Sequence, residues 1–170
     1  MEGHKIYARH SRVGAPDRLS VTLIKNCVRA ALLFEGVDMP CEVSILITDD
    51  NTIRGVNREF RGIDEPTDVL SFPMLRFSPP GWAAPEPVVI DPESGLVPLG
   101  EIIISAGRVD RQAREYGNTR ERETAYISIH SVLHLLGYDH VDEAEEKKLM
   151  REHEDAIMRG MGFFELGIRS

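Results

Sequence analysis

Three histidines fall within one eleven-residue window, HSVLHLLGYDH (130–140), which holds half of the six histidines in the chain. An α-helix advances about 100° per residue, so His130 and His134 project from the same helix face, one turn apart. Gly137 allows the chain to leave the helix, because glycine accepts a positive φ, and the reversed chain can then return His140 to the same point. Three neutral imidazoles would leave the fourth position of a tetrahedral Zn²⁺ for water, as in catalytic zinc sites. The spacing therefore predicts one Zn²⁺ bound by His130, His134, His140 and water; the alternative is three unrelated histidines.

The window is similar to the zinc-protease signature HExxHxxGxxH, with one important difference. In that signature a glutamate follows the first histidine and deprotonates the metal-bound water. Here Ser131 takes its place, and a serine hydroxyl is neutral at pH 7 and a poor base. Hydrolysis would have to rely on the metal, which lowers the pKa of its own water toward about 7, or on a base from elsewhere. The sequence therefore disfavours a peptidase.

Three motifs, taken in order, resemble those of the YbeY family. HSVLHLLGYDH resembles the family signature H-G-x-L-H-L-x-G-Y-D-H, FRGIDEPTDVLSFP (60–73) resembles its second signature, and LGEIIIS (99–105) resembles its L-G-D-I-x-I-S strand. The resemblance covers about residues 40 to 160. Ser131 replaces the usual glycine, Glu101 replaces the usual aspartate, and the segment between the second and third motifs is long. None of these departures removes a predicted metal ligand.

The resemblance implies a function for the whole chain. YbeY proteins are bacterial single-domain metalloproteins described as endoribonucleases of ribosomal RNA maturation. We therefore expect a metal-dependent endoribonuclease that cuts single-stranded regions of ribosomal RNA precursors, in 3′-end maturation of the small-subunit RNA and in ribosome quality control. The expected partners are the ribosomal RNA precursor, and small-subunit ribosomal proteins or an assembly GTPase.

The catalytic residues implied by the resemblance are Arg61 and His134. Phosphodiester cleavage needs positive charge near the developing negative charge, and the functionally important arginine of the family aligns with Arg61. The alternative for Arg61 is a structural salt bridge with Asp64 or Asp68. Asp139, beside His140, would either orient a ligand imidazole or cap the turn.

Further residues have weaker roles. Asp68 and Glu101 are candidates for a base or for orienting a ligand, while Tyr138 is assigned to packing rather than proton donation. His153, in the final helix, is interpreted as a packing residue and not as a ligand.

Two rival functions remain open. The first is a non-catalytic ribosome-assembly factor with a structural metal, which a sealed metal site would favour. The second is a metallohydrolase acting on substrates other than RNA, which a carboxylate near the metal-bound water would favour.

The histidines must be positioned by a helix that is apolar on nearly every side. Residues 119–136 carry Ala125, Ile127, Ile129, Val132 and Leu136, and a helix that is apolar all round is normally buried. Asn118 and Glu121 have the spacing of a capping pair before it. We therefore predict that the metal site lies on a central, buried helix.

The remaining elements predict an α+β fold with a mixed sheet of about four strands covered by about five helices. The expected strands are 5–10, 41–48, 68–72 and 101–105, and the expected helices are 17–35, a short one through Ile53 and Phe60, 109–116, 119–136 and 142–158. Residues 74–98 read as a long proline-rich loop, which is either functional or mobile.

Composition is consistent with one domain spanning residues 1–170. The chain is 42% hydrophobic, enough for a substantial core. Cys27 and Cys41 suggest buried free thiols rather than a disulfide. No apolar run approaches the roughly 20 residues of a membrane span and no signal-peptide pattern is visible. We therefore expect a cytoplasmic protein.

A net charge of −8 requires an explanation in a protein expected to bind RNA. Phosphate binding depends on lysine and arginine, whereas much of the acidic charge lies in residues 141–155. Two arginine sets recur at helical spacing and are either basic binding surfaces or ordinary solvated helix faces. They are Arg54, Arg58 and Arg61, and Arg108, Arg111 and Arg114. The charge distribution argues against non-specific coating of nucleic acid and suggests either selective substrate binding or a protein partner that supplies positive surface.

Overall fold

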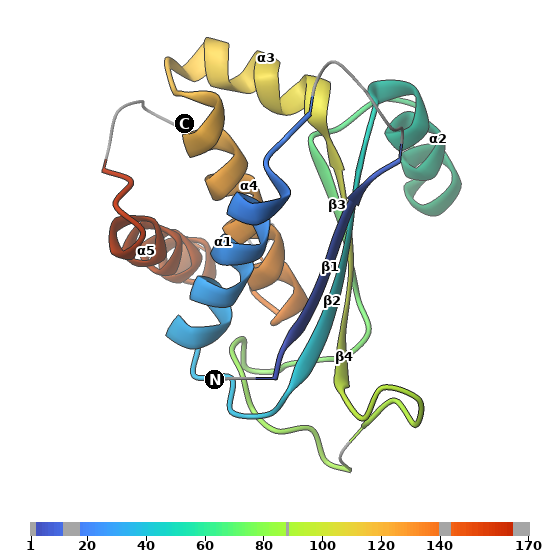
Figure 1. The fold of residues 1–170 in the computed structure, drawn as a ribbon, viewed down its shortest axis with the longest axis vertical. Helices are drawn as coiled ribbons and strands as arrows, with labels where there is room; N and C mark the ends of the chain where they lie inside the picture. Colours follow the sequence, from blue (N-terminus) through green and yellow to red (C-terminus); the bar gives the residue numbers. More distant parts are fainter. Residues whose placement is uncertain (1–2, 12–17, 88, 140–143, 165–170) are drawn as a thin grey trace.

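The computed structural model describes residues 3–11, 18–87, 89–139 and 144–164. They form a four-stranded mixed sheet and five helices (Figure 1), which confirms the α+β prediction. In chain order the elements are β1 (Lys5–His10), α1 (Val21–Phe34), β2 (Cys41–Thr48), α2 (Asp50–Arg61), β3 (Val69–Pro73), β4 (Val97–Ser105), α3 (Ala106–Tyr116), α4 (Arg120–Leu135) and α5 (Ala144–Gly160).

The sheet order is β1-β2-β4-β3, with β3 at one edge. β1 and β4 run parallel to β2, while β3 runs antiparallel to β4. Ile45 of β2 pairs with Ile102 of β4, and Ile102 pairs in turn with Ser71 of β3. These three side chains therefore share one face of the sheet, because paired residues point to the same side.

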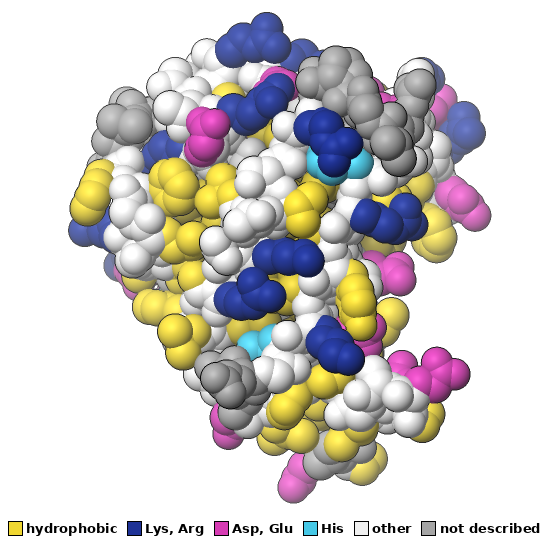
Figure 2. Space-filling view, viewed as in Figure 1, with side chains coloured by type: hydrophobic (Ala, Val, Ile, Leu, Met, Phe, Trp, Pro, Cys, Tyr) yellow, Lys and Arg dark blue, Asp and Glu magenta, His cyan; other side chains and the backbone are white. Residues whose placement is uncertain are grey.

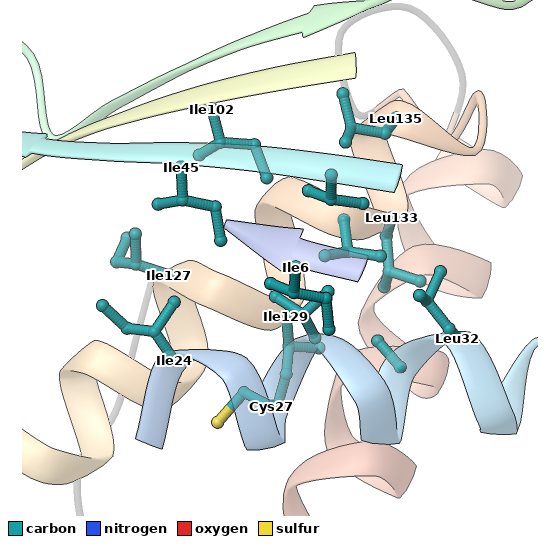
Figure 3. Packing of buried hydrophobic residues seen from close by; sticks show 14 of the residues in the cluster. Ile6, Ile24, Cys27, Leu32, Ile45, Ile102, Ile127, Ile129, Leu133 and Leu135 are labelled. Carbon is teal, nitrogen blue, oxygen red and sulfur yellow. The ribbon is translucent and has the colours of Figure 1, made fainter. Parts of the chain in front are cut away.

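α4 lies in the middle of the helical layer and packs between the sheet and its neighbours. Figure 1 shows α1, α4 and α5 on one side of the sheet and α2 on the other. Figure 3 shows Ile127, Ile129 and Leu133 of α4 pointing into a cluster with Ile45 and Ile102. The predicted central, buried helix is confirmed.

Three buried hydroxyl groups of α4 are hydrogen-bonded within the helix itself. The hydroxyls of Thr124, Ser128 and Ser131 donate to the carbonyls four residues earlier, at 2.8, 2.8 and 2.6 Å respectively. A hydroxyl bonded in this way can be buried without leaving a hydrogen-bonding group unsatisfied. The helix can therefore be buried on almost every side despite its polar residues.

β4 begins four residues earlier than expected, at Val97 rather than Glu101. Pro98 and Gly100 read as strand breakers in the sequence. Pro98 pairs with Glu42, where the register of β2 against β4 shifts, and proline is tolerated at such an irregularity. At Gly100, φ is +149° and a Cβ would lie 2.4 Å from the carbonyl oxygen of Phe72. The glycine therefore permits the close approach of β3 rather than ending the strand.

Helix ends also differ from the sequence-based boundaries. Ser20 caps α1, three residues after the expected start at residue 17. Ser105 caps α3, four residues before the expected start at residue 109. α4 is capped by Thr119, whose hydroxyl accepts from the backbone N–H of Arg122 at 3.1 Å, and not by Asn118. The expected start of the last helix, at residue 142, lies outside the described residues.

The proline-rich segment after β3 is anchored against the end of α4. The backbone N–H of Gly81 donates to the carbonyl of Leu136 at 2.9 Å, and the Trp82 indole N–H donates to Asp38 Oδ1 at 2.7 Å. The ring of Trp82 also packs against Phe77, with centroids 5.8 Å apart. This part of the segment supports the turn that follows α4.

Cys27 and Cys41 are free, buried thiols, as expected. Burial raises the pKa of each to about 12, and nearby Asp38 adds to the rise at Cys41. Both cysteines therefore stay protonated at neutral pH, which makes them unreactive as nucleophiles. Among the described residues, no helix is both long and apolar enough to span a membrane.

The negative charge is unevenly distributed over the surface. Figure 2 shows lysine and arginine side chains spread along the middle of the face on which α1 and β1 lie, whereas most acidic side chains in that view lie toward its margin. An overall charge of −8 therefore does not mean a uniformly acidic surface.

Candidate metal centre

Two of the three predicted ligands meet on α4. The Nε2 atoms of His130 and His134 lie 3.0 Å apart. Two imidazole nitrogens bound to one tetrahedral Zn²⁺ at 2.0–2.1 Å would be separated by about 3.3 Å. The pair therefore fits a shared zinc ion with little movement. His140 lies outside the described residues, and the described part of the chain contains no group of three or more side chains able to hold a metal.

A carboxylate from α5 orients His130. The Nδ1 atom of His130 lies 2.8 Å from Glu154 Oε2, and Glu154 is only 5% exposed. A neutral His130 that donates its Nδ1–H to this carboxylate presents the Nε2 lone pair toward His134. The ring of Tyr126 stacks on that of His130, with centroids 5.6 Å apart. Both contacts hold the imidazole in a ligand-ready orientation.

Glu154 was not among the residues predicted for the site, although the sequence contains a signal for it. It lies four residues after Met150 and three before Ile157, both of which are buried. An acidic residue on the apolar face of a helix is unusual unless it has a partner. The partner, His130, is 24 residues away in the sequence, so the pairing depends on how α5 packs against α4.

The two histidines line an open cleft of about 1110 Å³ between β3, α4, α5 and the end of α2. Among the described residues its wall contains four basic and four acidic side chains, so their formal charge is balanced although the chain carries −8. The basic ones are Arg61, Arg122, Lys147 and Arg151, and the acidic ones are Asp68, Asp139, Glu154 and Asp155. Because the cleft is open, a metal held by the histidines would be accessible to a substrate.

Arg61 lies at the end of α2 and is one of the residues lining this cleft. The alternative partner Asp64 is instead paired with Arg54 at 2.9 Å and with Arg58 at 3.7 Å. Within the described residues, Arg61 makes no ion pair with Asp64 or Asp68. Of the three arginines of α2, Arg61 is the one that reaches the cleft.

The other arginine set does not contribute to the cleft. Arg111 of α3 pairs with Asp50 at the start of α2, and none of Arg108, Arg111 and Arg114 lines the cleft wall. Burial alone would raise the pKa of Asp50, but hydrogen bonds from Ser105 and Arg111 outweigh it, so the pKa lies below its ordinary value. The ion pair between Arg111 and Asp50 links α3 to the start of α2.

The acidic residues considered as a base or as orienting groups do not all lie at the cleft. Asp139 and Asp68 both line the cleft, and Asp68 Oδ1 accepts from the backbone N–H of Val69 at 2.8 Å. Glu101 is exposed, pairs with Phe72 across the ladder, and does not line the cleft. Ser131 is fully buried and donates to Ile127, so it cannot act as a base at the histidines.

Tyr138, which lines the cleft, forms a cluster around Glu35 together with His153. The Tyr138 hydroxyl donates to Glu35 Oε2 at 2.8 Å, and His153 Nδ1 lies 2.6 Å from Glu35 Oε1. Burial, together with the Glu35 carboxylate, raises the pKa of Tyr138. This makes the phenol a poor source of protons, in agreement with its assignment to packing. His153 contacts Phe34 and Tyr138 rather than the paired histidines.

Comparisons with known proteins connect this arrangement to one family. The family described as Endoribonuclease YbeY matches residues 6–162. A Clostridium kluyveri protein named Endoribonuclease YbeY is 39% identical over 159 residues, which cover 89% of this chain and 94% of that protein. One from Agathobacter rectalis is 44% identical over 139 residues, covering 79% and 84% of the two chains.

A solved structure agrees with the fold. The solution structure of TM1509 from Thermotoga maritima superposes with a TM-score of 0.55 at 25% identity, covering 92% of this chain and 91% of that one. The match spans nearly the full length of both chains, and the sequence similarity extends over the elements that form the cleft. The chain therefore belongs to the endoribonuclease YbeY family.

Proposed function

We propose that this protein is a zinc-dependent endoribonuclease that cuts single-stranded RNA. The observation that carries the proposal is the pair of converging imidazoles, oriented by Glu154, at the wall of an open cleft. Family membership supports RNA as the substrate, and the ligand chemistry supports zinc. His140 would be the third ligand by its position in the sequence.

In this proposal, different residues bind the metal, stabilise the developing charge and stack on a base. His130 and His134 would hold the ion, and a bound Zn²⁺ would supply Lewis acidity and a water of lowered pKa. Arg61 would place its guanidinium beside the phosphate and offset the charge that develops during cleavage. Phe60, which is 65% exposed and packs edge-on against Phe72 at the cleft wall, offers a surface on which an unpaired base can stack.

The biological substrate we propose is a ribosomal RNA precursor in the cytoplasm, cut during 3′-end maturation of the small-subunit RNA. A role in ribosome quality control, with small-subunit ribosomal proteins or an assembly GTPase as partners, is part of the same proposal. The balanced charge of the described cleft residues suits this role, because phosphate is then not repelled there although the chain as a whole carries −8.

Structural features weigh against the assembly-factor function and, within the second rival, against a peptidase. A purely structural metal in an assembly factor would favour a sealed site, whereas the paired histidines line an open cleft. A peptidase of the HExxH type needs a glutamate where Ser131 lies buried and bonded to its own helix.

The first experiment compares the wild type with His134→Ala on a precursor fragment from the 3′ end of the small-subunit RNA. We expect only the wild type to cut, and chelation followed by zinc addition to abolish and restore the cutting. Equal cutting by both proteins would indicate a contaminating ribonuclease, and absence of cutting by both would favour the assembly-factor function.

A second experiment tests the role of Arg61. Arg61→Ala should lower kcat by roughly a hundredfold, the scale seen when one group that stabilises developing charge is removed. Arg58→Ala is the matched control, because Arg58 is on the same helix but pairs with Asp64 away from the cleft wall. Equal activities of the two variants would contradict a catalytic role for Arg61.

A further inference from the structure

The edge strand β3 forms part of the cleft wall along its whole length. All five residues from Val69 to Pro73 line the cleft. Among the described strands β3 pairs only with β4, since it is the last strand in the sheet order. Its other edge therefore directs main-chain groups toward the same space that the paired histidines line.

The direction of each main-chain group follows from the ladder. The N–H of Met74 donates to the carbonyl of Leu99, and the carbonyl of Asp68 accepts from the N–H of Ser105. Residues of an antiparallel strand alternate between pointing toward the partner and away from it. The main-chain groups of Val69, Ser71 and Pro73 must therefore point away from β4.

Of the three outward-pointing residues Val69, Ser71 and Pro73, Ser71 is the one whose main-chain N–H and C=O are both available for hydrogen bonds. The N–H of Val69 is already bonded to Asp68 Oδ1 at 2.8 Å, which also confirms the outward direction. Pro73 has no N–H. In addition, the Ser71 hydroxyl is a buried oxygen with no hydrogen-bond partner in the described part of the chain. It lies on the face of the sheet that carries Ile102 and packs against the helices.

We propose that the N–H and C=O of Ser71 bind the Watson–Crick edge of one unpaired base of the RNA, close to the scissile phosphate. This inference rests on the proposed ribonuclease function. Every standard base presents a donor next to an acceptor on that edge, and single-stranded RNA is commonly recognised there. A phosphate would be repelled by the carbonyl, so a base fits this edge better.

The arrangement gives a physical reason for single-strand selectivity. A base in a duplex has its Watson–Crick edge occupied by its partner and cannot bond to Ser71. An unpaired base can, whichever of the four it is, because the main chain supplies one donor and one acceptor without a base-specific side chain. The subsite therefore selects for strandedness rather than for sequence.

Modified RNAs test the proposal on the wild-type enzyme. One nucleotide at a time in a short oligouridylate is replaced by N3-methyluridine, which blocks the Watson–Crick edge, or by 5-methyluridine, which adds the same methyl group elsewhere. We expect one position near the cut at which N3-methyluridine lowers kcat/KM about tenfold and 5-methyluridine does not. Equal tolerance of both methyl groups at every position would overturn the subsite while leaving the ribonuclease function intact.

Two variants separate the main chain from the side chain. Ser71→Pro removes the outward N–H without removing a ladder bond, since proline is tolerated at such edge positions, and Ser71→Ala keeps that N–H. We expect Ser71→Ala to retain the discrimination against N3-methyluridine and a folded Ser71→Pro to lose it. Full discrimination by a folded Ser71→Pro would overturn the proposal.

Hydrogen exchange provides a measurement that does not depend on the proline variant folding. In the His134→Ala protein, which should leave RNA uncut, the Ser71 amide should exchange quickly alone and slow down when oligouridylate is added. The amides of Leu70 and Phe72, which point toward β4, should be protected in both states. A Ser71 amide unaffected by bound RNA would exclude the subsite, and failure of the wild type to act on any RNA would refute the proposed function itself.

Discussion

At the residue scale, the orientation of His130 depends on a carboxylate from a different helix. Glu154 lies 2.8 Å from His130 Nδ1 and is nearly inaccessible to solvent. A carboxylate that holds the non-ligating nitrogen of a histidine fixes its tautomer and its ring orientation. The metal affinity of the proposed site should therefore depend on Glu154, although the contact that Glu154 makes there is with His130.

Glu154→Ala should weaken zinc binding by roughly 10- to 100-fold, the range expected when an orienting partner of a ligand is lost. Competition with a chromophoric chelator measures this affinity directly. Glu152→Ala is the control, because Glu152 is an exposed residue of the same helix, 3.9 Å from Lys148. Equal zinc affinities of the two variants would show that Glu154 does not orient the ligand.

At the scale of elements, the turn after α4 depends on one glycine. Gly137 has φ of +91°, and a Cβ there would lie 2.6 Å from the carbonyl oxygen of Phe77. Both the backbone conformation and the close approach of the proline-rich segment therefore require glycine. The chain leaves α4 here on its way to His140.

Gly137→Ala should destabilise the protein by at least about 2 kcal/mol, since a left-handed conformation alone costs an alanine roughly 1–2 kcal/mol and the clash adds to it. Gly55→Ala, within α2 where a Cβ would meet nothing within 4 Å, should instead stabilise by roughly 0.5–1 kcal/mol. Urea denaturation measures both changes. A Gly137→Ala protein as stable as the wild type would contradict the tight packing of this turn.

A charge cluster joins α2, which carries Arg61, to the rest of the fold. Asp50 accepts a hydrogen bond from Ser105 at 2.6 Å and pairs with Arg111. Although burial opposes it, these partners hold the pKa of Asp50 below its ordinary value of 3.8. A carboxyl with a lowered pKa in the folded state stabilises the protein above its unfolded pKa. That stabilisation is lost as the pH falls through the lowered value.

Asp50→Asn should therefore reduce the free energy of unfolding at pH 7 and make it less dependent on pH below about 4. Denaturation curves collected from pH 7 down to pH 2.5 measure this slope. Arg111→Ala should flatten the same region, because it removes one of the groups that lower the pKa of Asp50. An unchanged slope in both variants would contradict the role assigned to this cluster.

At the scale of the whole molecule, the candidate metal site and the core share one helix. α4 contributes Ile127, Ile129 and Leu133 to the hydrophobic cluster and His130 and His134 to the cleft. Glu154 connects this site to α5. A ligand that binds only the folded arrangement stabilises it according to its concentration relative to its dissociation constant.

Zinc at about 100 times its dissociation constant should add roughly 2.7 kcal/mol, which corresponds to a rise in Tm of about 5–10 °C for a chain of this size. Differential scanning fluorimetry measures the shift. His134→Ala should show little or none of it. A wild-type Tm that does not respond to zinc would contradict a site shaped for this metal.

Local patterns in the sequence determined several helices and strands and the pairing of two histidines at the candidate site. Alternating apolar residues defined β2 from Cys41 to Thr48, and the nearly uniform apolar character of residues 119–136 identified α4 as buried. The four-residue spacing of His130 and His134 predicted that their side chains would meet. These features depend on strand and helix periodicity, which residues close in the chain are enough to establish.

Only the tertiary structure decided which distant residues meet. It placed Arg61 at the cleft and Glu101 outside it, and it brought Glu154 to His130 from 24 residues away. It also ordered the strands so that the edge of β3 at Ser71 is open to the cleft. Contacts of this kind arise from the packing of helices against the sheet and from strand order. No local periodicity encodes them, because each depends on segments that are far apart in the chain.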